Sequence, residues 1–197
     1  LGRQQIIVEL KEGTNNMTIK NPVATAIDSS YIQYKRMGDA LKEASSMWAK
    51  VTHSEEKPIT YSICEWGMAR PYLWGAKAGS MWRTTPDIAP NWRSITMIYN
   101  RTLKLYKYSG PGHWNDPDML EVGNGKLDDN ENRAHFSLWC MLAAPLMLGN
   151  DIRSFVSNGM PDKDNETLKI VTNKHMIAVD QDSLGKSAKR IKKESGI

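Results

Sequence analysis

The chain has 197 residues, a formal net charge of +4, 40% hydrophobic and 24% charged residues. This composition is typical of a globular protein and argues against disorder, and the longest apolar stretch, residues 136–148, is shorter than the ~20 residues that a bilayer requires. We expect neither a nucleic-acid nor a membrane partner, because positive and negative charges nearly balance before residue 186. The excess cations gather in the C-terminal tail, at Lys186, Lys189, Arg190, Lys192 and Lys193.

Two cysteines, Cys64 and Cys140, allow at most one internal disulfide, which excludes a cystine-rich mini-domain. Neither CxxC nor HExxH is present, so His113 and His135 are interpreted as structural or hydrogen-bonding residues rather than as zinc ligands. We therefore expect no metal and no cofactor. No signal peptide is visible in the chain, which leaves a secreted and a cytoplasmic location both open.

The first elements expected along the chain are a strand, a helix and a second strand. Residues 1–28 have weak periodicity, with a candidate strand at Ile6–Leu10. From Tyr31 onward, apolar residues recur at steps of three and four, which predicts an amphipathic helix whose inward face carries Tyr34, Met37, Leu41, Ala44 and Trp48. The run Ile59–Ile63 is then predicted to be a short buried strand.

The later elements repeat this alternation. A strand is expected to end at Trp82-Arg83, and Pro90 is expected to open a helix. The acidic run Asp128–Glu131 lacks the spacing of a calcium loop and is expected to cap the following helix. The remaining predicted elements are a strand at Met119–Val122, a helix at Asn130–Ala143, a strand at Leu146–Leu148 and a helix at Glu166–Thr172, with the inward face of the Pro90 helix carrying Trp92, Ile95, Ile98 and Leu103.

Repeated βα units predict an α/β fold with a parallel sheet, either doubly wound or closed into a barrel. Periodicity alone does not choose between these two. A complete (βα)₈ barrel usually takes ~250 residues, and only about four units can be counted here. If the chain forms a barrel, it is expected to form part of one.

Polar and aromatic residues gather directly after each predicted strand. The four clusters are Cys64–Gly67, Arg83–Asp87, His113–Met119 and Asn150-Asp151. Because the carboxyl ends of parallel strands carry the active sites of α/β proteins, these clusters are expected to converge on one pocket. The alternative for any single cluster is a polar loop of turn-forming residues.

The composition of these clusters favours a sugar site. Carboxylates accept hydrogen bonds from sugar hydroxyls, indole faces stack on pyranose rings, and glycoside hydrolysis needs paired carboxylates. The absence of a P-loop, of GxGxxG and of a GxSxG elbow argues against phosphate binding and Ser-His-Asp hydrolysis. The candidate sugar-binding residues are Glu65, Asp87, Asp116, Asp118, Trp66, Trp82 and Trp114.

Four long strings carry a resemblance to a known family: Tyr61–Gly67, Trp82–Ile88, Gly112–Leu120 and Ile177–Gly185. In order and spacing they resemble glycoside hydrolase family 27, the α-galactosidases or melibiases. The resemblance covers roughly residues 31–186. It implies a (βα)₈ barrel followed by a small antiparallel β domain, and retaining hydrolysis of terminal α-D-galactosyl groups by double displacement.

The resemblance also implies a division of the chain and roles for its residues. Residues 29–186 would be about strands five to eight of the barrel, between a poorly matched segment 1–28 and a basic tail 187–197. Asp87 matches the general acid/base, Arg83 a ligand of the galactose 2-hydroxyl, and Glu65 the residue that accommodates a free 2-hydroxyl. Asp116 is interpreted as structural. Further pocket residues are Cys64, Trp66, Asp118 and Met119.

One part of the family pattern has no match in this sequence. The family's nucleophile is an Asp in a Lys-aromatic-Asp string before the helix near Tyr31; Leu10–Gly13 has neither the aromatic residue nor the Asp, and Asp28 is too near the helix. The β domain is also unmatched. The chain is interpreted either as a truncated product or as a short form that pairs with another copy or with a separately encoded N-terminal half. A catalytically inactive galactoside-binding protein is the alternative function, and the natural galactoside stays open.

Overall fold

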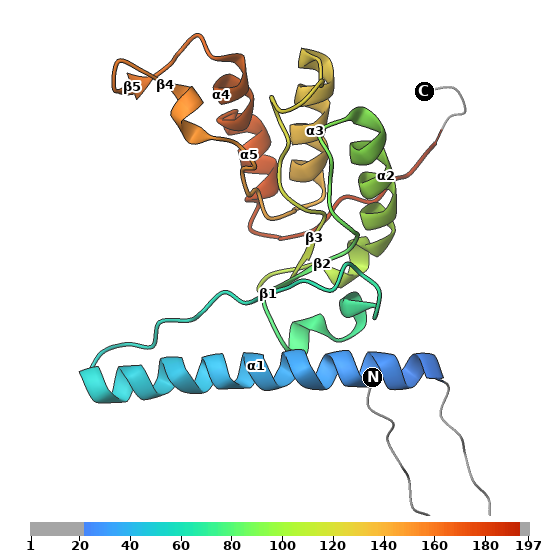
Figure 1. The fold of residues 1–197 in the computed structure, drawn as a ribbon, viewed down its shortest axis with the longest axis vertical. Helices are drawn as coiled ribbons and strands as arrows, with labels where there is room; N and C mark the ends of the chain where they lie inside the picture. The colour runs from blue at the N-terminus through green and yellow to red at the C-terminus, as the bar shows by residue number, and fades with distance from the viewer. Residues whose placement is uncertain (1–21, 194–197) are drawn as a thin grey trace, which may run out of the picture.

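The computed structural model describes residues 22–193, with side chains from residue 29 onward, so the strand predicted at Ile6–Leu10 lies outside the described residues. Three parallel strands form a sheet in the order β1-β2-β3, with β1 at Ser62–Ile63, β2 at Met81–Arg83 and β3 at Trp114–Asp116. In Figure 1 the long helix α1 crosses the bottom of the view, the helices α2–α5 gather at the top, and the sheet lies between them.

Helix α1 (Pro22–Thr52) confirms the predicted helix, but the predicted inward face is partly wrong. Met37 and Trp48 are 52% and 39% exposed, and Ala44 is exposed as well. The side facing the protein instead carries Tyr31, Tyr34, Gly38, Leu41, Ser45 and Ala49. Small residues lie on this face because the loop before β2 comes very close. A Cβ on Gly38 would lie 1.9 Å from the carbonyl oxygen of Ala78.

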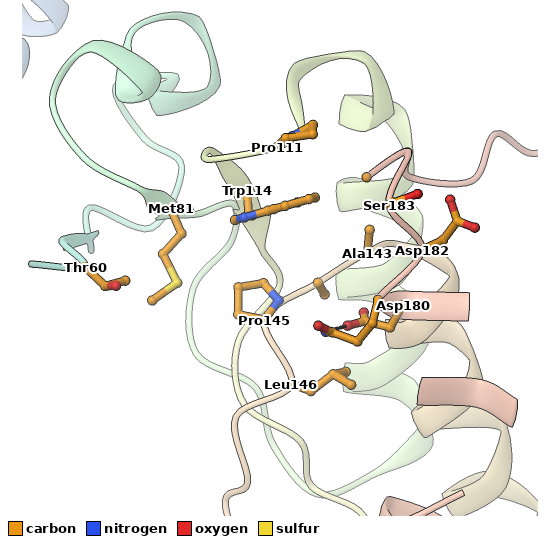
Figure 2. A pocket seen from close by; sticks show the side chains of 13 residues that line it. Thr60, Met81, Pro111, Trp114, Ala143, Pro145, Leu146, Asp180, Asp182 and Ser183 are labelled. Carbon is orange, nitrogen blue, oxygen red and sulfur yellow. Dashed lines mark hydrogen bonds between the residues drawn. The ribbon is translucent and has the colours of Figure 1, made fainter. Parts of the chain in front are cut away.

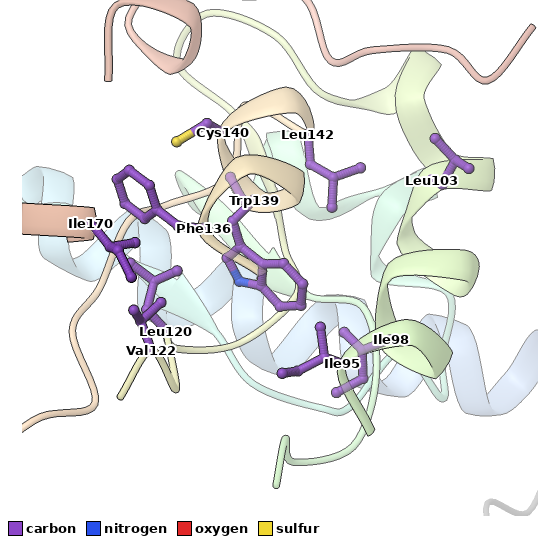
Figure 3. Close-up of a cluster of buried hydrophobic side chains, with 11 residues drawn as sticks. Ile95, Ile98, Leu103, Leu120, Val122, Phe136, Trp139, Cys140, Leu142 and Ile170 are labelled. Carbon is purple, nitrogen blue, oxygen red and sulfur yellow. The ribbon is translucent and has the colours of Figure 1, made fainter. Parts of the chain in front are cut away.

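The hydrophobic core is divided into two clusters. In the smaller one, Tyr31 and Tyr34 of α1 pack their rings on Trp74, with centroid distances of 5.9 and 5.8 Å. Its buried members are Ile63, Ala69, Trp74, Ala78 and Trp82. The larger cluster lies among the upper helices, and Figure 3 shows Trp139 at its centre. Its buried members are Ile95, Ile98, Leu103, Leu120, Val122, Phe136, Trp139, Cys140, Leu142, Ala144 and Ile170.

The third strand lies earlier in the chain than predicted. The strand predicted at Met119–Val122 is wrong, because β3 ends at Asp116, Pro117 has no N–H to offer a ladder, and Asp118 has a φ of 90°. Leu120 then returns to the sheet through a single parallel bridge with Leu148. The predicted strand Leu146–Leu148 is reduced to this bridge, and the strand predicted at Ile59–Ile63 is shortened to β1.

The helices begin where side chains cap them. Helix α2 (Trp92–Thr102) starts after Asn91, whose side chain accepts from Ser94 N–H, so Pro90 is not its first residue. Helix α3 (Asp129–Met141) confirms the predicted capping role of the acidic run, because Asp128 and Glu131 form a capping box. The short 3₁₀ helices are η1 (Pro71–Leu73), η2 (Gly75–Lys77), η3 (Leu103–Tyr108) and η4 (Ile152–Phe155).

The last part of the chain contains elements that the pattern did not show. A hairpin of β4 (Val156–Ser157) and β5 (Met160–Pro161) is followed by the predicted helix, α4 (Glu166–Val171). An unpredicted helix, α5 (Lys174–Asp180), then begins at an Asn173 cap. None of the helices between residues 22 and 193 combines the length and apolar character needed to cross a membrane.

As far as residue 193, the segment predicted as a basic tail lies along the helices. Ala188 N–H donates to the Met141 carbonyl at 2.8 Å, and Arg190 Nη1 donates to Asn100 Oδ1 at 2.9 Å. The Lys189 ammonium lies 5.8 Å from the ring centroid of Tyr106. The cations of this segment are thus partly engaged with the chain itself.

His135 on α3 is a fully buried, neutral histidine. Its Nε2 accepts a hydrogen bond from Glu121 N–H at 2.9 Å, and its ring meets Trp139 edge to face at a centroid distance of 4.2 Å. Burial lowers the pKa of His135 to about 4, because the imidazolium would be desolvated in the core. This agrees with the structural role expected from the sequence.

We expect His135 to make the chain sensitive to acid. Its pKa is about 4 in the folded state against 6.5 in the unfolded state, so the unfolded state binds more protons between these values. Its contribution to the free energy of unfolding is present above pH 6.5 and is lost as the pH falls to 4, by about 3 kcal/mol. In urea denaturation between these pH values, the free energy of unfolding of His135→Gln should fall less steeply with decreasing pH than that of the wild type. Glutamine keeps an acceptor for Glu121 N–H.

The exposed His175 offers a matched control, since His175→Gln also removes one histidine. Equal pH slopes for the wild type and His135→Gln would contradict the assignment of the acid sensitivity to His135.

Candidate active site

The register of the parallel strands sorts their side chains onto two faces. Ser62 is level with Met81, and Met81 with Trp114, while one residue further on the buried Trp82 is level with Ile63 and Asn115. The last pair, Arg83 and Asp116, lies at the carboxyl edge. Because side chains alternate along a strand, Arg83 and Asp116 point to the same face as Met81 and Trp114. Two of the predicted clusters therefore meet at this edge.

Arg83 is the centre of the polar contacts at the carboxyl edge. Its side chain is only 11% exposed, and its Nη2 lies 2.5 Å from Asp118 Oδ2 and 3.0 Å from Asp87 Oδ1. The same nitrogen is 3.3 Å from the carbonyl oxygen of Thr85. One guanidinium thus joins a carboxylate that follows β2 to a carboxylate that follows β3.

Asp118 ties the two loops together through its backbone neighbours as well. Its Oδ2 accepts from Ile88 N–H and its Oδ1 from Met119 N–H, both at 2.8 Å. Asp118 N–H donates to Asp116 Oδ1 at 2.8 Å. Burial raises the pKa of Asp116, and the hydrogen bond from Asp118 N–H and the charge of Arg83 partly oppose that rise.

Asp87 differs from Asp118 in its exposure. The Asp87 side chain is 71% exposed and pairs with Arg83, whereas the Asp118 side chain is 8% exposed. Met119, the next residue after Asp118, is also exposed. The edge therefore presents an exposed carboxylate, paired with Arg83, beside a buried ion pair.

The Cys64–Gly67 cluster borders the same edge. Gly67 has a φ of 77°, and a Cβ there would lie 2.3 Å from the carbonyl oxygen of Thr84, so this loop packs directly beside Arg83. Tyr34 of α1 donates to the Cys64 carbonyl at 2.8 Å. Cys64 and Trp66 are largely exposed side chains.

Glu65 turns its carboxylate back into its own loop. Its Oε2 accepts a hydrogen bond from Ala69 N–H, and its Oε1 is buried without a hydrogen-bond partner. Burial raises the pKa of Glu65, and the backbone hydrogen bonds from Ala69 and Gly67 oppose that rise.

The fourth predicted cluster has different contacts. Asn150 donates to the Val122 carbonyl at 2.8 Å and to Asn124 Oδ1 at 3.1 Å, and Asp151 caps η4. These contacts fasten the segment that continues beyond the Leu120–Leu148 bridge. The structure thus brings three of the four clusters together around Arg83.

Two of the three indoles proposed for sugar stacking lie elsewhere. Trp82 is wrong as a stacking residue, because it is fully buried and donates to Asn115 Oδ1 at 2.8 Å. The alternation of side chains between the two faces of β2 is the sequence signal that places Trp82 and Arg83 on opposite faces. Trp114 stands at the start of β3, at the opposite end of the sheet from Asp87. Trp66 is the indole beside the Arg83 edge.

Trp114 belongs to a pocket of about 420 Å³ at the amino ends of the strands (Figure 2). The pocket is lined by residues from before β1, from the starts of β2 and β3 and the loop before β3, from the segment that follows α3, and from the segment that follows α5. Asp180 lines it as well; this residue is buried, its Oδ1 has no hydrogen-bond partner, and burial raises its pKa to about 6. This cavity is therefore separate from the predicted site, since its lining includes none of Arg83, Asp87 and Asp118.

The structure also places the potential metal ligands and the two thiols of the described residues. Between residues 29 and 193, no three His, Cys, Asp or Glu side chains are grouped so that they could hold a metal ion. Cys64 and Cys140 are both free thiols, one exposed and one buried. Burial raises the pKa of the Cys140 thiol to about 12, which keeps it protonated.

The fold and the site together define an α/β protein of the parallel βα class, with an acidic, indole-bearing edge at the carboxyl ends of its strands. The sequence model of the family described as Alpha galactosidase A matches residues 24–182. The chain belongs to this family, the α-galactosidases of glycoside hydrolase family 27, as the strings in its sequence indicate.

Individual relatives agree with this assignment. An α-galactosidase of Oryza sativa is 39% identical over 170 residues, which are 85% of this chain and 39% of that protein. The structure of α-galactosidase I from Mortierella vinacea has a TM-score of 0.71 at 32% identity, covering 86% of this chain and 43% of that one. A Saccharomyces cerevisiae α-galactosidase structure with raffinose has a TM-score of 0.64 at 31% identity, covering 83% and 37%. The chain thus spans about two fifths of the length of these relatives.

We expect the loss of Arg83 to destabilise the fold far more than the loss of Asp87. Arg83→Ala leaves the buried Asp118 carboxylate without its counter-charge, which should lower the free energy of unfolding by about 3–5 kcal/mol. Asp87→Ala removes an exposed carboxylate and should lower it by less than about 1 kcal/mol. Urea denaturation measures both, and equal losses would contradict the burial of the Arg83–Asp118 pair.

We expect Asp180→Asn to stabilise the chain near neutral pH. The raised pKa means that the carboxyl contribution to stability is present below the ordinary value of 3.8 and is lost as the pH rises through about 6. A neutral amide removes this loss, so Tm at pH 7.5 should rise by about 2–4 °C and Tm at pH 4 should change less. Asp182→Asn, at an exposed residue of the same pocket, is the matched control. An equal rise in the Tm of Asp180→Asn at pH 7.5 and at pH 4 would refute the explanation.

Proposed function

We propose that this chain carries the acid/base side of an α-galactosidase active site, with Asp87 as the general acid/base of retaining α-D-galactoside hydrolysis. The observation that carries the proposal is the pairing of an exposed Asp87 carboxylate with a buried Arg83 at the carboxyl end of β2, 3.0 Å apart. Family membership supports the same assignment, because these residues lie in the string Trp82–Ile88 that matches the family.

The chemistry of the proposal follows from the exposure of each group. In the complete family mechanism, Asp87 would protonate the glycosidic oxygen as it leaves and the galactosyl group bonds to the nucleophile, which is not found in this sequence. Asp87 would then take a proton from the water that releases the sugar from the nucleophile. Arg83 would donate to the galactose 2-hydroxyl, and its contact with Asp118 restricts its side chain to the side where Asp87 lies. Cys64, Trp66 and Met119 are exposed around this edge and would form the wall of the sugar site, with Glu65 behind them.

We also propose that residues 29–186 form about strands five to eight of a (βα)₈ barrel. Two features support this: β1, β2 and β3 are parallel and in chain order, and the parallel Leu120–Leu148 bridge adds a further pass of the chain. The agreement with 43% of the Mortierella vinacea structure is consistent with part of a barrel. Residues 187–193 continue from it along α2 and η3.

The proposed substrate class is a terminal α-D-galactoside, since the yeast relative was crystallised with raffinose. The nucleophile string of the family is not found in this sequence, so the isolated chain is proposed to bind the galactoside and to position the acid/base without turnover. This same observation favours the second candidate, a galactoside-binding protein without turnover. For the first candidate, a complementary N-terminal half would supply the nucleophile, whereas self-association would join copies of the same sequence and would not add that string.

Galactose titration with the purified chain tests the binding part of the proposal. We expect saturable binding that is weakened about tenfold or more by Arg83→Lys, since the compact ammonium of lysine does not reproduce the planar set of donors of a guanidinium. Asp87→Asn should bind as the wild type does, because it keeps the shape of the side chain. Circular dichroism of each variant checks folding, and the absence of galactose binding by a folded wild-type chain would overturn the proposed site.

Hydrolysis of an aryl α-galactoside tests the catalytic part. The isolated wild-type chain and Asp87→Ala should both stay at the buffer rate, because the covalent step lacks its acceptor. Turnover by the wild type that disappears in Asp87→Ala would show that the chain contains its own nucleophile. Turnover that persists in Asp87→Ala would refute the acid/base assignment.

A further inference from the structure

Asp118 holds a backbone conformation that an aspartate rarely adopts. Its φ is 90°, in the region that only glycine occupies freely, and it follows directly after Pro117. A strained residue of this kind persists only where its surroundings impose the conformation. The groups that contact the Asp118 backbone therefore decide where its carboxylate points.

Two hydrogen bonds fix the polar groups of this backbone. Asp118 N–H donates to Asp116 Oδ1 at 2.8 Å, and the Asp118 carbonyl accepts from the indole Nε1–H of Trp139 at 2.8 Å. The first bond is local, whereas the second comes from helix α3. Trp139 is itself immobilised, because it is fully buried and its ring meets the ring of His135 at a centroid distance of 4.2 Å.

The Asp118 carboxylate carries this constraint to the acid/base loop. Its Oδ2 accepts from the backbone N–H of Ile88, the residue after Asp87, and pairs with Arg83. Arg83 in turn holds Asp87. A continuous series of short polar contacts therefore runs from the core of the helical layer to the exposed carboxylate.

We propose that Trp139 is a positioning residue of the site: its indole N–H holds Asp118 in the left-handed conformation and thereby aims the Asp118 carboxylate at Ile88 N–H and Arg83. These contacts alone support the proposed placement of the loop that carries Asp87 and Ile88. Its meaning for catalysis rests on the proposed function, through the role given to Asp87.

A purely structural role for Trp139 makes a different prediction. Trp82, in the smaller cluster, is an equally buried indole, and its Nε1–H also donates at 2.8 Å, but to Asn115 Oδ1. Replacing either tryptophan by phenylalanine removes a buried donor and leaves an aromatic ring. Only Trp139→Phe releases the Asp118 carbonyl, so the two variants separate positioning from general loss of stability.

Amide hydrogen exchange of the full ¹⁵N-labelled chain reports on the loop without any ligand. We expect Trp139→Phe to speed exchange of the Ile88 amide about tenfold or more, because that amide donates to the Asp118 carboxylate. Trp82→Phe should change it less than about twofold, and the amide of the buried Ile98 on α2 serves as the reference for global stability. An unchanged Ile88 rate in folded Trp139→Phe, or equal rates in both variants, would overturn the proposal.

If Trp139→Phe does not fold, the wild-type chain offers a second test of the coupling between Trp139 and the Ile88 amide. Under increasing urea, the Trp139 indole N–H and the Ile88 amide should exchange through one opening, with the same free energy and the same urea dependence. Different urea dependences would refute the coupling. Neither measurement uses galactose, so a failure of galactoside binding would not change the hydrogen-exchange result. A failure of the hydrogen-exchange test would likewise leave the proposed galactoside binding standing.

Discussion

The site depends on one buried ion pair, between Arg83 and Asp118. Burying two charges is costly unless the geometry is favourable and the remaining polar atoms are satisfied. Here the pair is 2.5 Å apart and both Asp118 carboxylate oxygens also accept backbone N–H groups, although Arg83 Nε is buried without a hydrogen-bond partner. The parallel register of β2 and β3 makes this possible, because it sets Arg83 level with Asp116, two residues before Asp118. The exposed Asp87 obtains its position from this pair.

The same pair joins the two halves of the core. Arg83 follows Trp82, which belongs to the cluster against α1, whereas Asp118 contacts Trp139 and precedes Leu120, which both belong to the larger cluster. A shift of one cluster against the other would therefore separate the charges. The carboxyl groups around the pair are held mostly by backbone N–H groups, as in Glu65 with Ala69 and Asp116 with Asp118. A single guanidinium thus serves an edge that is rich in acids.

The sequence predicted much of this arrangement through local signals. Apolar spacing identified α1 and α2, the acidic run Asp128–Glu131 identified the start of α3, and the residues after the predicted strands identified the edge where Arg83, Asp87 and Asp118 meet. It failed where local patterns are ambiguous. The strand predicted at Met119–Val122 is apolar enough for a strand, but Pro117 and the φ of Asp118 end the ladder before it. Helix α5 is too short to show a clear periodicity in the sequence, and the Asn173 cap marks where it begins.

What the sequence determined by itself is the family and the residue types of the edge, because long strings of fixed order and spacing carry that information without any coordinates. What only the tertiary structure decided is the direction in which each side chain points. Trp82 and Arg83 are neighbours in the chain, yet one fills the core and the other holds Asp87, since a strand sends successive side chains to opposite faces. Likewise, nothing local links Trp139 to Asp118, 21 residues away, and their hydrogen bond exists because packing brings α3 against the loop after β3.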